Sequence, residues 1–227
     1  MSKKRRRDYE SNSRFQDFFP IAPKNKSQEL LGESIKNNYC SLGIGCAGTG
    51  KSLITVYEGV RLLKNRLVDK ILYLKPNVGL FQEKGIGFLP GELEEKTLPL
   101  LAPVLDNLDA FCSKGFKDSL IKQKKIEYGL LEYLRGRSLN HTYVILDEAQ
   151  NASKHAILTC LSRISDTSKI VILGDPNQCD LPPSFKSGLT DAGRRLKGVK
   201  EVGITYFSPN DRVRNSFLQE ALDRYEF

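Results

Sequence analysis

The segment from Gly45 to Ser52, with the sequence GCAGTGKS, limits the possible folds of this chain more than any other part of it. It matches the pattern GxxxxGK[ST] in full, in which glycine-rich backbone turns its N–H groups toward phosphate oxygens at the start of a helix. An apolar run (39–44) precedes it and a run with helical period (52–64) follows it, as this pattern requires. We therefore predict a nucleoside-triphosphate site. Its predicted contacts are Gly45, Cys46, Ala47, Gly48, Thr49, Gly50, Lys51 and Ser52.

Two side chains of this segment have separate predicted tasks. The Lys51 ammonium is expected to reach the β- and γ-phosphates, and the Ser52 hydroxyl is expected to hold Mg²⁺. An ordinary glycine-rich turn is the alternative interpretation, and the flanking strand and helix patterns count against it.

Apolar strands alternate with helices along the rest of the chain, which is typical of a three-layer α/β fold with a mostly parallel sheet. Ligands of such sheets bind at the carboxyl ends of the strands. Ser27 is the predicted N-cap of the first helix. The predicted strands are 39–44, 70–74, 142–146, 169–173 and 201–206; the predicted helices are 28–36, 52–64, 154–164, 189–196 and 213–225, with 76–91 a loop and 92–124 mainly helical.

Two acidic residues follow the apolar run 142–146. Asp147, at the tip of a buried strand, is well placed to bind Mg²⁺ directly or through water. Glu148 comes next, and a carboxylate beside a metal ligand can act as a general base toward the attacking water. A solvent-exposed acid at the start of a helix is the alternative for Glu148. Together with the P-loop upstream, the pair predicts a hydrolysis site.

Three further residues are candidates for contacts with the nucleotide. Gln178 follows the apolar run 169–173 and can hydrogen-bond the γ-phosphate or the lytic water, with a plain Gly-Asp-Pro turn (174–176) as the alternative. Arg214 could stabilise charge at the γ-phosphate, in cis or from a neighbouring subunit, and a solvated helix start explains its position equally well. Gln28 could read adenine through its two-faced amide.

The formal net charge of +8 is concentrated at the N-terminus. Five basic residues, Lys3 to Arg7, precede the first acid, and without them 30 basic residues face 27 acidic ones, a net charge of +3. We predict a basic, disordered tail at residues 1–18 and one folded domain at residues 19–227. The tail could bind nucleic acid, act as an import signal or simply be solvated.

Neither a secretory h-region nor a run long enough to span a membrane is visible in the sequence. The five cysteines are odd in number and form no CxxC pair, so we predict mostly buried, reduced thiols rather than disulfides or metal ligands. These features predict a cytoplasmic protein that has no membrane partner.

Taken together, these motifs resemble the PhoH-like family of P-loop ATPases, from about Lys24 to Tyr225. Single-domain members of phage type have about this size. So many motifs in one order are highly specific. The segments that carry the resemblance are GIG at 43–45, GFLPG at 87–91, LRGRSLN at 134–140, ILDEAQN at 145–151, GD at 174–175, QCDLP at 178–182, KSGL at 186–189 and VR at 213–214.

The resemblance implies a RecA-like fold similar to the first motor domain of superfamily-one helicases. It also implies ATP binding and hydrolysis with Mg²⁺, a link to RNA, ring-shaped homo-oligomers such as a hexamer, and a bacterial or phage-infected host cytoplasm. By match, Arg214 takes the arginine-finger position and Gln28 the adenine-reading position.

The chain departs from the family pattern at three places. Lys75-Pro76 stands where Arg-Pro is usual, and lysine lacks the bidentate fork of arginine. The loop from 76 to 87 is longer than usual. Cys46-Ala47 and Ser52 replace the common Pro-Ala and Thr of the P-loop. We expect the loop still to bind the nucleotide and Mg²⁺ with these residues.

Three functions are compatible with these residues. The first is an oligomeric ATPase that couples hydrolysis to work on RNA or single-stranded DNA, with the basic tail, Lys75, Arg135 and Arg137 as candidate contacts. Structural pairing with acids or carbonyls is the alternative for Arg135 and Arg137. The second is a nucleotide-dependent switch or binding module with slow turnover. The third is a small-molecule kinase, against which Glu148 counts because it would activate water.

Overall fold

Six strands form one sheet in the computed structural model of the chain. They are β1 (Cys40–Gly45), β2 (Lys70–Lys75), β3 (Ile126–Leu130), β4 (Thr142–Leu146), β5 (Lys169–Gly174) and β6 (Val202–Phe207). Their order across the sheet is β3-β2-β4-β5-β1-β6, and each pairing is parallel. All carboxyl ends therefore lie at one edge. The structure describes residues 17–76, 101–134, 136, 138–182, 186–213, 217, 220 and 224.

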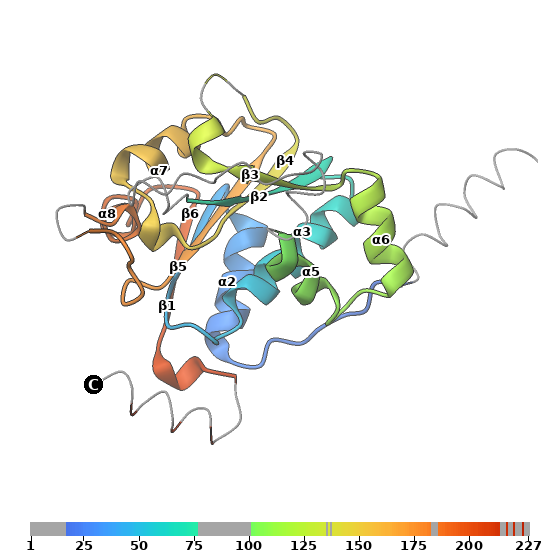
Figure 1. The fold of residues 1–227 in the computed structure, drawn as a ribbon, viewed down its shortest axis with the longest axis horizontal. Helices are drawn as coiled ribbons and strands as arrows, with labels where there is room; N and C mark the ends of the chain where they lie inside the picture. The colour runs from blue at the N-terminus through green and yellow to red at the C-terminus, as the bar shows by residue number, and fades with distance from the viewer. Residues whose placement is uncertain are drawn as a thin grey trace, which may run out of the picture.

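Helices cover both faces of this sheet (Figure 1). They are α2 (Lys26–Asn37), α3 (Lys51–Lys64), α5 (Ala102–Leu108), α6 (Lys114–Lys122), α7 (Lys154–Leu161) and α8 (Gly188–Arg195), with 3₁₀ turns η3 (Leu131–Leu134), η4 (Ala149–Asn151) and η5 (Pro209–Asp211). The first four pack on one face, and η3, α7 and α8 on the other. The predicted three-layer fold is confirmed. No helix in the described part of the chain is long and apolar enough to cross a membrane.

Alternation along the central strand divides the core into two clusters. On β4, Tyr143 and Ile145 pack with α3, whereas Val144 and Leu146 pack with α7 and α8. All four side chains are buried, which explains why the strand is continuously apolar rather than alternating. The Tyr143 hydroxyl donates to the Thr55 carbonyl of α3 (3.1 Å), so its polar atom is satisfied inside the core.

The N-cap of α2 differs from the prediction. The cap is Asn25, whose extended backbone lets Oδ1 accept a hydrogen bond from Gln28 N (2.8 Å). Ser27 lies inside the first turn because the helix begins at Lys26, so the prediction of Ser27 was wrong. Asn25 also donates through Nδ2 to the Asp211 carbonyl (2.7 Å), which holds η5 beside the start of α2.

The edge strand β3 was not predicted. It contains Glu127 and Gly129, and among the described strands it pairs with β2 alone, so no apolar run marks it in the sequence. The other strands and helices begin and end within three residues of their predicted bounds. Within the predicted helical stretch 92–124, the described part contains α5 and α6. Residues 77–91 of the predicted loop, and most of the predicted closing helix, lie outside the described residues.

The N-terminal boundary also needs a small correction. Phe18 stacks on Tyr57 (ring centroids 5.1 Å apart) and meets Phe111 edge to face (5.7 Å). It also forms an antiparallel bridge with Cys112. Phe18 therefore belongs to the packed part of the chain rather than to the basic tail in which the sequence placed it, because its ring covers apolar surface of α3.

None of the five cysteines is bridged. Cys40, Cys46, Cys112 and Cys160 are buried and Cys179 is exposed. Burial raises the pKa of Cys40, Cys112 and Cys160 to about 12, so these thiols stay protonated and unreactive. The prediction that most of these thiols are buried is confirmed.

Candidate nucleotide-binding and hydrolysis site

The P-loop joins the end of β1 to the start of α3 at the carboxyl edge of the sheet. Gly45 and Gly50 have φ angles of 136° and 81°, which side chains rarely adopt. A Cβ on Gly45 would stand 2.0 Å from Phe207 O, and one on Gly50 would stand 2.4 Å from Gln28 Nε2. The loop therefore lies tight against β6 and α2. The N–H groups at the start of α3 remain suited to an anion, because the first turn carries no acid.

Lys51 is the first residue of α3 and folds back on the loop. Its ammonium donates to the carbonyl oxygens of Gly45 and Cys46, both at 2.6 Å. Burial lowers the pKa of Lys51, and the carboxylates of Asp175 and Asp147 act in the opposite direction. The predicted phosphate-binding cation is thus held inside the loop, facing two carboxylates.

Gln28, predicted to read adenine, is buried against the P-loop. Its Nε2 donates to the Thr49 carbonyl (2.9 Å), and its Oε1 accepts from Lys24 N (2.8 Å). Only 2% of the residue is exposed. The amide braces the P-loop from α2, and its reading of adenine stays a prediction.

Asp147 and Ser52 converge beside the P-loop. Ser52 Oγ lies 3.4 Å from Asp147 Oδ2, and the Tyr73 hydroxyl of β2 donates to the same oxygen (2.8 Å). Burial and the nearby Asp147 carboxylate raise the pKa of Tyr73, so its hydroxyl stays protonated and remains a donor. The backbone N–H of Glu148 donates to the other oxygen, Asp147 Oδ1 (3.0 Å). Both carboxylate oxygens are therefore oriented by the fold.

The donor set at this point fits Mg²⁺. A hydroxyl and a carboxylate supply hard oxygen ligands, and Mg²⁺ commonly takes one or two protein oxygens together with phosphates and water. Within the described residues, no group of three or more His, Cys, Asp or Glu could hold a metal ion. The pair Ser52 and Asp147 therefore suits a cation shared with a nucleotide better than a permanent metal centre.

Glu148 adopts a left-handed backbone conformation, with φ 54° and ψ 35°. For a residue other than glycine this costs on the order of 1–3 kcal/mol. Its Oε2 accepts from Gln150 Nε2 (2.8 Å), and its side chain is 46% exposed, so water can reach it. The backbone of Glu148 is thus strained, and its carboxylate is oriented by Gln150 and accessible to water. Such a carboxylate next to Asp147 is suited to act as a general base.

Gln150 links the ends of β4 and β5. Besides Glu148, its Nε2 donates to the Gln178 carbonyl (3.1 Å). Its Oε1 accepts from Asp175 N (3.1 Å). Because Gln150 is only 1% exposed, removing its amide would leave buried backbone groups without partners. One side chain thus ties the predicted base to the loop that carries Gln178.

Asp175 connects this network to the P-loop. Its Oδ2 accepts from Ala47 N (3.1 Å), and its Oδ1 accepts from Asn177 N (3.0 Å). Gln178 N donates to the Asp175 carbonyl (3.0 Å), which closes the turn. Gln178 is exposed and lines the same cavity as the P-loop. A contact from this side chain to a γ-phosphate or to water is therefore geometrically possible.

The remaining candidates fall in different places. Lys75 ends β2 with its ammonium 4.0 Å from Glu148 Oε1, beside the hydrolysis site. Arg135, Arg137 and Arg214 lie outside the described residues. Val213, the residue before Arg214, donates its N–H to the Gly48 carbonyl (3.0 Å), so the chain passes the P-loop there.

One cavity of about 260 Å³ joins these parts. It brings together five residues whose side chains were given roles from the sequence, Lys51, Ser52, Asp147, Glu148 and Gln178, and four further residues of the predicted P-loop. The other lining residues are Ala47, Gly48, Thr49, Gly50, Leu53, Asn107, Gly174 and Asp175. Strand ends far apart in the sequence thus meet around one cavity.

Sequence reasoning missed the supporting side chains. Tyr73 sits in an apolar strand and looks like core, but the register pairs it with Ile145, two residues before Asp147. The one feature of the sequence that could have identified its role is a polar hydroxyl in an otherwise apolar strand. Gln150 stands two residues after Glu148. Its role depends on a hydrogen bond to Asp175, 25 residues further along the chain, and the spacing in the sequence does not show this contact.

Comparisons with known proteins agree with this architecture. The family model described as PhoH-like protein matches residues 20–226. The PhoH-like protein of Bacillus subtilis (strain 168) is 37% identical over 206 residues, which cover 91% of this chain and 64% of that protein. Protein PhoH of Escherichia coli (strain K12) is 33% identical over 211 residues, covering 92% and 59%. The chain thus spans about three fifths of the length of these relatives.

Solved structures share the fold at low identity. The large terminase from a thermophilic bacteriophage has a TM-score of 0.55 and 12% identity, covering 90% of this chain and 50% of that one. The same terminase in complex with ADP has a TM-score of 0.53 and 12% identity, covering 88% and 49%. At this identity the likeness shows the fold alone, that of a P-loop NTPase motor domain.

Proposed function

Because this chain belongs to the PhoH-like protein family, we propose that it is a Mg²⁺-dependent ATPase that couples hydrolysis to the binding of RNA or single-stranded DNA. The observation that carries the proposal is the shared cavity in which Lys51, Asp147 and Glu148 meet. Phosphate binding, a metal ligand and a base toward water are the three parts that phosphoryl transfer to water needs.

In this proposal each residue of the cavity has a separate role. The P-loop N–H groups and Lys51 bind the β- and γ-phosphates and stabilise the charge that develops between them. Mg²⁺, held through Ser52 and Asp147, supplies charge neutralisation at the phosphate oxygens when it is bound. Glu148 takes the proton of the attacking water, with Gln150 holding its carboxylate in place.

An oligomer is part of the same proposal. The described residues form one motor domain, and we propose that a ring of such domains, for example a hexamer, acts on the strand. Arg214 is the proposed arginine finger at the γ-phosphate, and Gln28 the proposed reader of adenine. Lys75, Arg135, Arg137 and the basic tail are proposed contacts to nucleic acid.

Phosphate release from ATP is the test of this function. The purified protein is assayed with Mg²⁺ or with EDTA, in the presence and absence of a poly(U) and an oligo(dT) strand. We expect hydrolysis that requires Mg²⁺ and is stimulated by at least one strand. ATP binding without hydrolysis would favour a nucleotide-dependent switch. Light scattering with ATP and strand present tests the ring, and a strictly monomeric protein would contradict it.

A further inference from the structure

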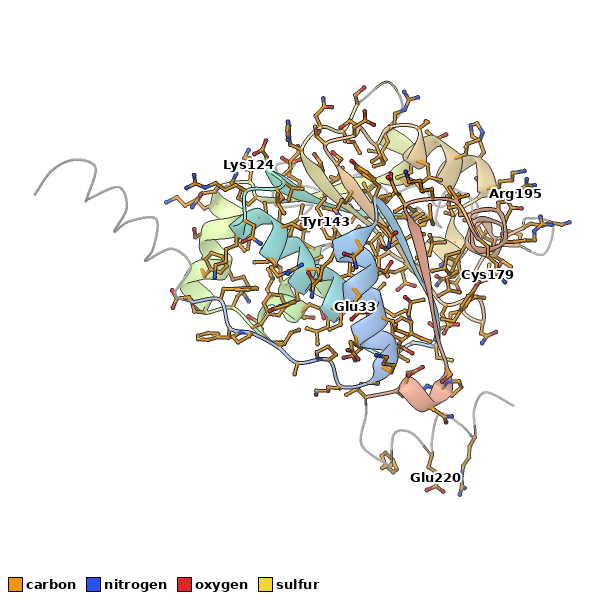
Figure 2. All side chains as sticks on the ribbon, turned by 180° about the vertical axis from the view of Figure 1, so that it is seen from behind. Glu33, Lys124, Tyr143, Cys179, Arg195 and Glu220 are labelled. Carbon is orange, nitrogen blue, oxygen red and sulfur yellow. The ribbon has the colours of Figure 1, made fainter. Side chains whose placement is uncertain are left out.

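A second cavity, of about 560 Å³, lies at the N-terminal end of α7 and along α8. The described residues that line it include four cations and one carboxylate, so three positive charges are in excess. Figure 2 shows Arg195 at the outer edge of the molecule, on the side where Cys179 also lies. The lining residues are Lys154, Lys186, Ser187, Thr190, Asp191, Arg194 and Arg195.

The cations of this cavity are accessible. Asp191 accepts from Arg195 Nε (2.8 Å) and from Arg194 (3.0 Å), and this anchors the two guanidinium groups along α8. Both arginine side chains remain more than half exposed, at 55% and 75%. Lys154 and Lys186 are exposed, and neither forms an ion pair within the described part of the chain. Their charges therefore face solvent and are open to an anion.

A hydroxyl group gives a second, independent indication of an anion. Ser187 Oγ is buried and has no hydrogen-bond partner among the described residues. Ser187 precedes α8, and this helix has no side-chain N-cap bond. A buried donor without a partner is costly, and a phosphate oxygen would satisfy it. The helix dipole adds positive potential at the same point.

We propose that this cavity binds the phosphate backbone of a nucleic-acid strand. Lys154 comes from α7, Arg194 and Arg195 come from α8, and Lys186 comes from the segment before α8. The exposed side chains at the rim suit a nucleic-acid chain that continues past the site. No aromatic side chain is among the described lining residues. The contacts are therefore with phosphates rather than stacked bases, and the binding is independent of sequence. The inference rests on the proposed function and names a nucleic-acid site for it, separate from Lys75.

The cavity is bonded directly to the segment that carries the proposed base. Gly188 N, at the start of α8, donates to the Ala152 carbonyl (2.7 Å), and Ser153 forms a bridge with Ser187. Gln150, two residues before Ala152, holds Glu148. A nucleic-acid strand that contacts both Lys154 and the start of α8 would act on the segment 148–153. This contact is the proposed route from nucleic-acid binding to hydrolysis.

The test compares two double variants that each remove two positive charges. Lys154→Gln with Lys186→Gln changes the cavity, and Lys114→Gln with Lys122→Gln changes exposed lysines of α6, at the opposite side of the molecule in Figure 1. Fluorescence anisotropy with labelled oligo(dT) and oligo(U) strands gives the affinity at several salt concentrations. Circular dichroism and the melting temperature check that each variant is folded.

We expect the cavity variant to lose affinity by at least about tenfold at 0.1 M salt and to lose stimulation of ATP hydrolysis. Its plot of log affinity against log salt should flatten by roughly 0.7 for each lost phosphate contact. The α6 variant should match the parent. If the parent binds and is stimulated while both variants match it, the site assignment fails and the proposed function stands. If the parent binds neither strand, the nucleic-acid part of the proposed function fails as well.

Inorganic phosphate is the second probe. At constant ionic strength, phosphate should displace the strand no better than chloride does, because a single anion contacts only part of the cavity. Displacement by phosphate at much lower concentration than chloride would assign the cavity to a small oxyanion and overturn the strand site.

Discussion

The two halves of the candidate nucleotide site are built in different ways. The P-loop half is one run of consecutive residues, closed by Lys51 and by backbone contacts to its neighbours. The hydrolysis half is assembled from three strand ends through the side chains of Tyr73, Gln150 and Asp175. The first half is therefore local in the sequence and the second is not. This difference predicts that variants of the P-loop lose ATP binding, whereas variants of the side-chain network keep binding and change the rate.

Lys51→Ala should have the largest effect, because Lys51 is the one cation of the P-loop segment and lines the cavity in which we propose that phosphates bind. We expect kcat/KM for ATP to fall by at least about a hundredfold, with a matching loss of nucleotide affinity. Titration with a fluorescent ATP analogue checks the affinity. Lys64→Ala, at the far end of α3, is the control. Unchanged ATP affinity in Lys51→Ala would remove the contrast between the two halves.

Gln150→Ala should reduce kcat by roughly ten- to a hundredfold, because Glu148 and the Asp175 loop lose their common partner. Steady-state kinetics should show little change in KM for ATP, since the side-chain hydrogen bonds of Gln150 go to Glu148, Gln178 and Asp175 and not to the P-loop. Thermal unfolding separates loss of fold from loss of rate. A large rise in KM with kcat unchanged would show that Gln150 serves binding instead.

Tyr73→Phe should act mainly through the metal. Without the hydroxyl, Asp147 Oδ2 loses one of its orienting donors, and the Mg²⁺ concentration for half-maximal hydrolysis should rise by up to about tenfold. Tyr143→Phe is the matched control, because it deletes a buried hydroxyl that bonds only the Thr55 carbonyl of α3. Equal Mg²⁺ dependence in both variants would contradict the role of Tyr73.

Asn25→Ala should have the smallest effect on turnover and a measurable one on stability. The loss of the α2 cap should lower the free energy of unfolding by about 1 kcal/mol. Ser27→Ala tests the cap that the sequence suggested, and it should change stability far less. Urea unfolding of the two variants decides between them. The reverse order would mean that the helix starts where the sequence indicated.

The sequence was informative wherever a function is carried by neighbouring residues. The P-loop, Asp147 with Glu148, and the central buried strands could be placed because each is a continuous run with a strong pattern. The edge strand β3 was missed because Glu127 and Gly129 interrupt its apolar pattern. The roles of Tyr73 and Gln150 were missed because they depend on strand register and on a loop from another strand, which no local spacing encodes.

A single-turnover measurement shows whether Glu148 is the base that activates water. ATP is bound in the presence of excess protein and Mg²⁺, and its conversion to ADP and phosphate is followed in the parent and in Glu148→Gln, which keeps the shape of the side chain and removes its basicity. We expect both proteins to bind ATP with similar affinity, and we expect the variant to cleave it at least about a hundredfold more slowly. Cleavage at the parent's rate in Glu148→Gln would show that Glu148 is not the base and would contradict the proposed hydrolysis site.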